Sequence, residues 1–207
     1  MGHVSKVPTA AFTNSQKILT GSHDRTIKIW DLCKGYCVRT IFTLSSVNGI
    51  SIVDSDGDVF VSGHLDSNLR VLDARSGGVV KEIVGVHGGQ VTGVEVFGGN
   101  RVLTTSRDHS LRVIDLRTFE VLKVMQGDTF RVGLNWSRSC WSPDGQYVAS
   151  GSADGNIWVW NANSGIVQNE LKQSASAACA VVWHPQGLFV YSAETAKNIM
   201  IWGTDYQ

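Results

Sequence analysis

The sequence predicts an all-β protein, a β-propeller made of five repeats that each fold as a four-stranded antiparallel blade. Short hydrophobic runs recur along the chain, turn residues separate them, and polar residues keep fixed distances ahead of each run. The runs end at Trp30, Leu72, Ile114, Trp160 and Trp202. These anchors are 42, 42, 46 and 42 residues apart. A period of about 40–45 residues with several short strands per unit is typical of a propeller blade.

The first unit shows how the strands are predicted. Residues 17–20 form an apolar and β-branched run, residues 21–25 are rich in turn-forming types, and residues 27–30 form the next run. Such punctuation favours short antiparallel strands joined by tight turns. A single blade cannot bury both of its faces, so neighbouring blades must stack and supply the rest of the core. We place the repeats at about 1–41, 42–83, 84–125, 126–171 and 172–207.

Polar residues stay in phase with the anchors. A hydroxyl residue precedes each anchor by ten positions: Thr20, Ser62, Thr104, Ser150 and Ser192. An aspartate precedes the first four anchors by six positions, as Asp24, Asp66, Asp108 and Asp154, and the fifth unit has Ala196 there. Histidine stands 27 positions ahead of the anchor in two units, as His3 and His87, whereas the second unit has Ser45.

This pattern resembles the WD-repeat family over essentially the whole chain. The resemblance implies a buried hydrogen-bond chain within a blade, and only one unit has the complete set: His3, Thr20, Asp24 and Trp30. An indole N–H can donate to a hydroxyl, the hydroxyl to an imidazole, and the imidazole to a carboxylate. Partial sets are expected from Ser62, Asp66, His87, Thr104, Asp108, Ser150, Asp154 and Trp160. The incomplete blades are expected to depend more on apolar packing.

The same residue types could also form a nucleophilic triad, so an enzyme has to be considered. Against it, the motif recurs in several units, whereas an active site is normally single. The hydroxyl and the aspartate also lie four residues apart within one hairpin, without a strained nucleophile elbow. We therefore expect a structural role for these residues, no catalysis and no cofactor.

More distinctive segments resemble one branch of the WD-repeat proteins. They are Ser62-Gly63-His64-Leu65-Asp66, Asp73-Ala74-Arg75-Ser76, Ser106-Arg107-Asp108, and Gly133-Leu134-Asn135-Trp136 ahead of Trp141-Ser142-Pro143-Asp144-Gly145. Together they are similar to the carboxy-terminal propeller of the autophagy-related protein 16 family. The resemblance implies a scaffold and autophagy adaptor that supports lipidation of a ubiquitin-like protein during autophagosome assembly. It also implies a cytoplasmic location, with peripheral recruitment to the forming autophagosome membrane.

In that family the ubiquitin-like conjugation complex binds a coiled coil, and these 207 residues contain no sustained heptad of the required length. The alternative function is a WD-repeat subunit of another complex, such as a ubiquitin-ligase substrate receptor or a vesicle-trafficking scaffold. We also expect the five repeats to be part of a seven-bladed ring, left open with two free sheet edges.

Protein partners are expected on the face formed by the turns, where side chains are free to specify. The candidates for contact with a partner are His23, Arg25, Arg107 and His109. The simpler interpretation is that these are ordinary solvated turn residues. His64 and His184 are expected only to fill turns or core edges.

Composition excludes several other classes of protein. The 18 basic and 18 acidic residues balance, and no basic cluster predicts a nucleic-acid partner. The longest uncharged stretch, 173–193, is interrupted by polar residues, so no transmembrane segment is predicted. The four cysteines lack the spacing of paired metal ligands, and we expect reduced thiols and no metal site.

Overall fold

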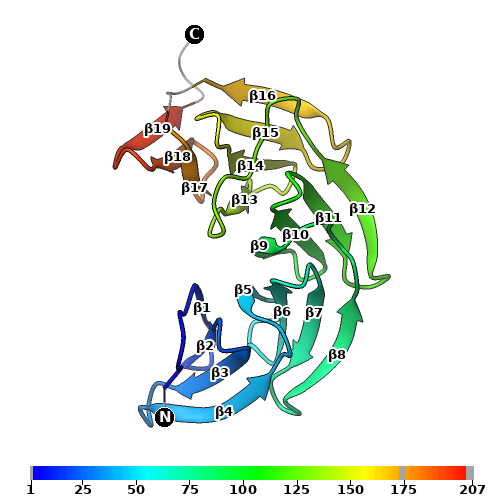
Figure 1. The fold of residues 1–207 in the computed structure, drawn as a ribbon, viewed down its shortest axis with the longest axis vertical. Helices are drawn as coiled ribbons and strands as arrows, with labels where there is room; N and C mark the ends of the chain where they lie inside the picture. The colour runs from blue at the N-terminus through cyan, green and yellow to red at the C-terminus, as the bar shows by residue number, and fades with distance from the viewer. Residues whose placement is uncertain (1, 173–175, 204–207) are drawn as a thin grey trace.

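The structure is a computed structural model that describes residues 2–172 and 176–203. Every regular element in the described residues is a β-strand, and the strands form five antiparallel sheets. Each sheet is one blade, and the blades follow one another in sequence order (Figure 1). The all-β propeller architecture predicted from the repeat is therefore confirmed.

The strands of the five blades are numbered in chain order. Blade 1 consists of β1 (Thr9–Phe12), β2 (Lys17–Gly21), β3 (Thr26–Asp31) and β4 (Tyr36–Phe42). Blade 2 consists of β5 (Val47–Ile52), β6 (Val59–His64), β7 (Leu69–Asp73) and β8 (Gly78–Ile83). Blade 3 consists of β9 (Val91–Phe97), β10 (Arg101–Ser106), β11 (Leu111–Asp115) and β12 (Glu120–Met125). Blade 4 consists of β13 (Ser139–Trp141), β14 (Tyr147–Gly151), β15 (Ile157–Asn161) and β16 (Val167–Leu171). Blade 5 consists of β17 (Ala178–Trp183), β18 (Phe189–Glu194) and β19 (Ile199–Gly203).

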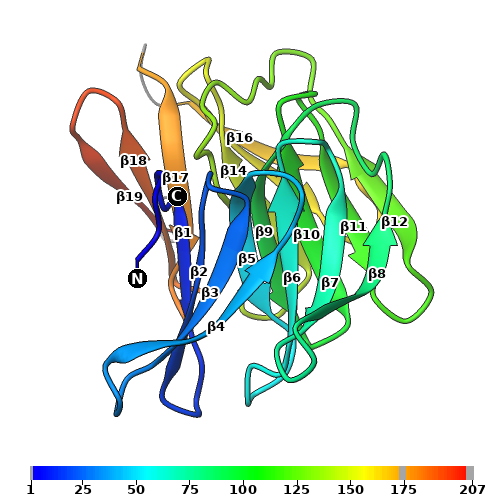
Figure 2. The ribbon, with the colours of Figure 1, turned by 60° about the horizontal axis from the view of Figure 1, so that its bottom comes forward.

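The blades form an open arc, not a closed ring, with blades 1 and 5 at its two ends (Figure 1). The first strands, from β1 to β17, line the inner edge of the arc, and β4, β8, β12 and β16 form its outer edge. Figure 2 shows the sheets twisted and stacked side by side, as expected for radially packed blades. In the described part of the chain blade 5 has three strands, so the four-stranded prediction holds for blades 1–4.

Each anchor residue lies in the third strand of its blade, and the anchors of blades 1–4 directly follow a shift in register. In blades 1–4 the pairing between the third and fourth strands slips by one residue just before the anchor, at Ile29/Trp30, Val71/Leu72, Val113/Ile114 and Val159/Trp160. Such a bulge increases the local twist and redirects the following side chain. The regular recurrence of the first four anchors along the sequence therefore corresponds to one repeated feature of the backbone.

The hydrophobic core lies between the blades. One cluster joins Leu19 and Ile27 of blade 1 to Val47 and Phe60 of blade 2, and all four side chains are fully buried. Three similar clusters join blade 2 to 3, blade 3 to 4 and blade 4 to 5. Each blade thus completes the core of its neighbour, which is the general principle of repeat proteins.

Candidate functional site

The complete polar set of blade 1 forms a continuous hydrogen-bond chain. The indole Nε1 of Trp30 donates to the Thr20 hydroxyl over 2.7 Å. That hydroxyl lies 2.7 Å from Nε2 of His3, and the other ring nitrogen of His3 lies 2.8 Å from the Asp24 carboxylate. The side chains of His3 and Asp24 are only 5% and 6% exposed. This hydrogen-bond chain connects the segment before β1 to β2, to β3 and to the turn between them. Each of its four side chains has a hydrogen-bond partner.

The carboxylate of Asp24 is held in its charged form. Burial alone raises the pKa of Asp24. Hydrogen bonds from the Thr26 hydroxyl, the Val4 amide and the His3 imidazole outweigh burial, and the pKa falls well below its usual range. The imidazole therefore meets a permanent negative charge at neutral pH, and this charge orients its N–H toward Asp24.

Blade 3 contains the same arrangement without the tryptophan. His87 lies 2.9 Å from the Asp108 carboxylate through one ring nitrogen and 2.8 Å from the Thr104 hydroxyl through the other. The third strand offers Ile114 in place of an indole, and Ile114 is fully buried in the core between blades 2 and 3. Burial raises the pKa of Asp108, but hydrogen bonds from His87 and Ser110 lower it well below the usual range. The polar chain thus persists when an apolar residue replaces its last member.

Blade 2 obtains its imidazole from a different position. His64 is fully buried at the end of β6, and its Nε2 lies 2.7 Å from the Ser62 hydroxyl. Blades 1, 3 and 4 have Ser22, Ser106 and Ser152 at the position of His64. Burial lowers the pKa of His64 to about 4, so the ring is neutral at pH 7. His64 therefore does more than fill a turn or core edge: it replaces the histidine that Ser45 cannot supply.

The aspartate of blade 2 binds a different partner. Asp66 forms an ion pair with Arg70 at 2.7 Å, and Arg70 also pairs with Glu82 at 2.5 Å. The side chain of Arg70 is only 6% exposed. Two carboxylates around one guanidinium compensate for its removal from water. Ser62 and Asp66 therefore belong to two separate contacts, not to one chain.

In blade 4 the structure does not join the expected residues. Trp160 donates to the Gln126 carbonyl at 3.0 Å, while the Ser150 hydroxyl receives a hydrogen bond from Ser139. Asp154 instead accepts from the Thr129 hydroxyl at 3.0 Å. The expected set of Ser150, Asp154 and Trp160 is therefore corrected. The three residues do not form a chain because blade 4 has no imidazole to link the hydroxyl to the carboxylate.

An aromatic cluster occupies the interior of blade 4. The ring of Phe130 packs edge-on against Trp160 at 5.0 Å and against Trp158 at 6.2 Å between centroids. Phe130 and Trp160 are fully buried, and the two tryptophans stack on each other at 6.0 Å. Edge-to-face aromatic pairs contribute beyond the area they bury.

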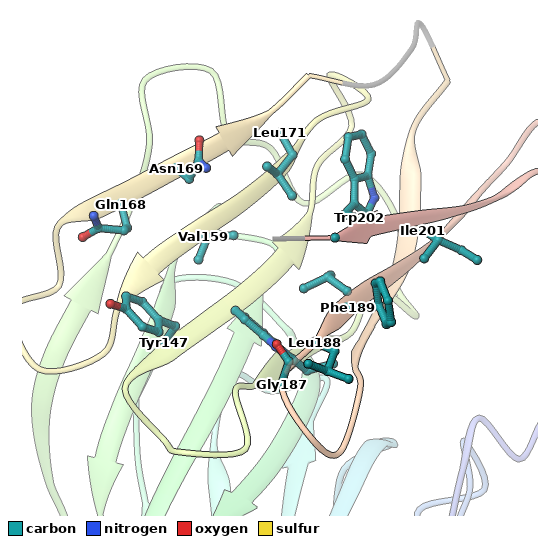
Figure 3. Close-up of a pocket in the computed structure, with 13 residues that line it drawn as sticks. Tyr147, Val159, Gln168, Asn169, Leu171, Gly187, Leu188, Phe189, Ile201 and Trp202 are labelled. Atoms are coloured by element: carbon teal, nitrogen blue, oxygen red, sulfur yellow. The ribbon is translucent and has the colours of Figure 1, made fainter. Parts of the chain in front are cut away.

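Blade 5 retains one contact of the pattern and has a groove beside it. The indole of Trp202 donates to the Ser192 hydroxyl over 3.0 Å. Between blades 4 and 5 lies a groove of about 620 Å³ that includes Leu171, Phe189 and Ile201 (Figure 3). Ile201 on β19 is 65% exposed. The outer side of blade 5 therefore presents apolar side chains to solvent.

The turns that follow the hydroxyl strands have the same backbone conformation in every blade. The residue after the aspartate position has a positive φ throughout: Arg25, Ser67, His109, Gly155 and Lys197. In every blade the residue before the aspartate position donates its amide to a carbonyl of the segment that precedes the first strand, as Arg107 does to Gln90 at 3.0 Å. The turns are therefore fixed platforms on one face of the arc.

The four candidates for contact with a partner divide into two pairs. His23 and Arg25 of blade 1 are exposed. Arg107 and His109 of blade 3 are partly buried and contact Val132: the Arg107 guanidinium donates to its carbonyl at 2.6 Å, and its amide donates to Nδ1 of His109 at 3.2 Å. The first pair fits the description of solvated turn residues, whereas the second pair is held in a defined geometry.

Sequence reasoning did not identify Arg138, which lies at the inner edge of the arc. Its guanidinium donates to the Asn48 carbonyl at 2.8 Å, to the Pro8 carbonyl at 3.3 Å and to the Thr92 carbonyl. One side chain of blade 4 thus binds blades 1, 2 and 3. In the sequence, Arg138 is distinguished only by its position immediately before a predicted first strand.

Among residues 2–172 and 176–203, no group of three or more His, Cys, Asp or Glu side chains is placed to hold a metal ion. The same residues include no helix long and apolar enough to cross a membrane.

Comparison with known proteins agrees with this geometry. The family model described as "WD domain, G-beta repeat" matches residues 1–31 and 120–161. Protein tipD of Dictyostelium discoideum is 44% identical over 183 residues, which are 86% of this chain and 30% of that protein. Autophagy-related protein 16 of Arabidopsis thaliana is 42% identical over 178 residues, 84% of this chain and 35% of that protein. The human U5 small nuclear ribonucleoprotein 40 kDa protein is 31% identical over 170 residues, 79% of this chain and 47% of that protein.

The chain therefore spans about a third of the length of the first two relatives. The matches confirm the resemblance to WD-repeat proteins and to autophagy-related protein 16 that the repeat spacing and the distinctive segments predicted.

Proposed function

Because the chain belongs to the WD-repeat family and is similar to autophagy-related protein 16 over most of its length, we propose that it is the propeller region of an autophagy adaptor. The family assignment and the blade architecture support an autophagy-related scaffold for protein interactions. Within that role, we propose that the protein is not an enzyme and acts by holding partners.

The observation that carries this proposal is the use of the polar residues inside the blades. The Thr20 hydroxyl accepts from Trp30 and pairs with His3, so the residues that resemble a triad are occupied in a structural chain. Thr104 and His87 repeat the arrangement in blade 3. A nucleophile must be accessible to its substrate, whereas these hydroxyls are already hydrogen-bonded. The recurrence of the motif in two blades also indicates a structural role and not a catalytic one.

The finer part of the proposal concerns the complete protein. We propose that it supports lipidation of a ubiquitin-like protein during autophagosome assembly, in the cytoplasm and peripherally at the forming membrane. The conjugation complex would bind a coiled coil outside these 207 residues, as the resemblance implies, and the propeller would bind other proteins. This division of roles is supported by the greater length of the relatives, because the chain matches only 30% and 35% of them and the rest has room for another binding region.

On the propeller, we propose that the turn face is the partner-binding surface. The five turns share one backbone conformation and one anchoring hydrogen bond, which provides a rigid base for variable side chains. His23, Arg25, Arg107 and His109 remain the proposed contact residues on this face.

Affinity purification of the full-length protein, followed by identification of the bound proteins, tests the proposal. We expect the ubiquitin-like conjugation machinery to be recovered, and we expect cells that lack the protein to show reduced lipidation of the ubiquitin-like protein. Recovery of a ubiquitin ligase or a vesicle coat without the conjugation machinery would replace this function with the alternative scaffold roles.

A further inference from the structure

A small basic surface lies where the turn between β10 and β11 meets the segment between β12 and β13. It consists of Arg107, His109 and Arg131, which surround Val132, and of Trp136 further along the same segment. We refer to these four residues as the basic loop surface. The segment between β12 and β13 runs from the outer edge of the arc across blade 4 to its inner edge (Figure 1). This segment belongs to the unit in which the anchor interval is 46 residues instead of 42.

The cationic side chains of this surface are held by backbone groups. Arg107 donates to the Val132 carbonyl at 2.6 Å, and exposed Arg131 donates to the Phe130 carbonyl at 2.7 Å. Each of these contacts uses a single N–H of one guanidinium nitrogen, and a guanidinium has five N–H donors. Because these contacts already restrict both side chains, the remaining N–H donors can bind a partner with little further loss of side-chain entropy.

Within the described residues, neither arginine of the surface forms a direct ion pair. In the part of the chain that the structure describes, neither Arg107 nor Arg131 has a carboxylate oxygen within 4.0 Å. The nearby carboxylates of Asp108 and Asp154 already accept hydrogen bonds within their own blades. The exposed Asp128 lies on the same segment as Arg131 and is not paired with it.

His109 shows how closely the two arginines approach. Burial lowers the pKa of His109, and the charges of Arg131 and Arg107 lower it further, against the opposing effect of Asp108. Its Nδ1 accepts the Val132 amide at 3.2 Å, which requires a neutral ring with the proton on Nε2. Two fixed cations and one neutral N–H donor therefore share this part of the turn face.

Trp136 offers an exposed apolar side chain on the same segment, four residues after Val132. Its side chain is 59% exposed, and the preceding residue, Asn135, accepts a hydrogen bond from Gln90 at 2.7 Å. An exposed tryptophan on an anchored loop costs solvation free energy unless a partner covers it. Tryptophan and arginine are also the residues that contribute most often to the affinity of protein interfaces.

We propose that the basic loop surface binds an acidic segment of a protein partner, with carboxylates on Arg107 and Arg131 and an apolar side chain against Trp136. This inference rests on the proposed scaffold function and specifies the chemistry of one of its partners. Guanidinium groups match carboxylates in bidentate geometry. A membrane surface is the less suitable occupant, because lipid recognition of this kind uses clusters of about four to eight exposed basic residues.

The test uses the full chain and a fluorescein-labelled decapeptide of alternating Glu and Ala, with a Gln and Ala decapeptide as the uncharged probe. Fluorescence anisotropy should show binding of the acidic peptide only, weakening with added salt. The double variant Arg107→Ala with Arg131→Ala should weaken binding by about tenfold or more, since close charge pairs at interfaces have coupling energies of this size. Arg131→Glu, a change at an exposed side chain, should abolish binding without affecting the fold.

A matched control is available on the other side of the molecule. Exposed Arg39 donates to the Ser76 carbonyl at 2.9 Å, the same kind of contact that Arg131 makes. Arg39→Ala with Arg75→Ala removes the same total charge and should change the affinity by less than about twofold. Equal losses in the two double variants would mean that only net charge matters and would overturn the proposal.

Two further outcomes would also overturn it. The first is that the acidic peptide does not bind. The second is that phosphatidylserine vesicles bind through Arg107 and Arg131 while the peptide does not. Neither result would affect the adaptor function, because the conjugation machinery would still be recovered with the full-length protein carrying Arg131→Glu. Loss of that machinery from the wild-type purification would instead contradict the adaptor function and leave the peptide result standing.

Discussion

Blade 1 and blade 4 have the same strand order and the same bulge before the anchor, yet their interiors are stabilised by different chemistry. In blade 1, Trp30 ends a polar chain through Thr20 and His3 to Asp24. In blade 4 the equivalent Trp160 packs against Phe130 and donates only to a backbone carbonyl.

The difference shows that the backbone of a blade does not depend on the polar chain. The bulge and the apolar clusters between blades are present in both cases. The polar chain is one of two ways to fill the space behind the anchor, and an aromatic cluster is the other. Blade 2 has neither arrangement in full: the aliphatic Leu72 is buried at the anchor, and only the Ser62–His64 contact remains of the polar chain.

The largest effect is expected from removing the aromatic cluster of blade 4. Phe130→Ala deletes a fully buried ring that contacts both Trp158 and Trp160, and should reduce the free energy of unfolding by about 3–5 kcal/mol. Urea denaturation with hydrogen exchange resolved by blade would measure it. Ile166→Ala, at a side chain that is 68% exposed, should change stability by less than about 0.5 kcal/mol. A loss below 1 kcal/mol for Phe130→Ala would mean that the cluster does not stabilise the blade.

The fold and the candidate site differ in how far the sequence could predict them. Turn residues and hydrophobic periodicity act locally, so the anchors and the strands follow from their spacing, and the resemblance to the WD-repeat family adds the first polar chain. His64 was missed because its role depends on two simultaneous changes, the loss of histidine at Ser45 and its gain where other blades have serine. Arg138 was missed because its contacts lie 46, 90 and 130 residues away in the chain. No local pattern encodes distances of that kind.

A second expected effect compares the aspartates of the two blades. Asp24→Ala leaves the His3 imidazole, the Val4 amide and the Thr26 hydroxyl without their acceptor, and should cost about 2–3 kcal/mol in blade 1. Asp154→Ala in blade 4 removes an acceptor for the exposed Thr129 hydroxyl, for the Asn156 amide and, at 3.4 Å, for the Trp158 indole, but it leaves no histidine unpaired and should cost less than Asp24→Ala. Hydrogen exchange of the amides in β2 and β14 would report the two losses separately. Equal losses would contradict the distinction between the blades.

A third expected effect concerns pH at the junction of blades 3 and 4. Burial raises the pKa of Glu95 from 4.5 to about 7, against a hydrogen bond from the Trp141 amide that lowers it. Since the folded protein favours the protonated carboxyl, its contribution to stability is present below about pH 4.5 and is lost as the pH rises through about 7. Glu95→Gln should therefore be about 2–3 kcal/mol more stable than the wild type at pH 8 and equal to it at pH 4. Urea denaturation at the two pH values would test this, and a difference that is independent of pH would contradict it.

The smallest expected effect comes from giving blade 2 the histidine position of blades 1 and 3. His64→Ser alone should cost about 1–2 kcal/mol, because it removes a buried ring and leaves the Ser62 hydroxyl without its 2.7 Å partner. Adding Ser45→His places an imidazole at the offset that His3 and His87 occupy, and the double variant should return to within about 0.5 kcal/mol of the wild type. Recovery of stability would be incomplete to the extent that Asp66 stays paired with Arg70, at 2.7 Å, and does not bind the new imidazole. The free energies of the two single variants and the double variant form a complete cycle. Additive losses in that cycle would mean that the two positions do not replace each other, and that the histidine of blade 2 serves a purpose different from the polar chains of blades 1 and 3.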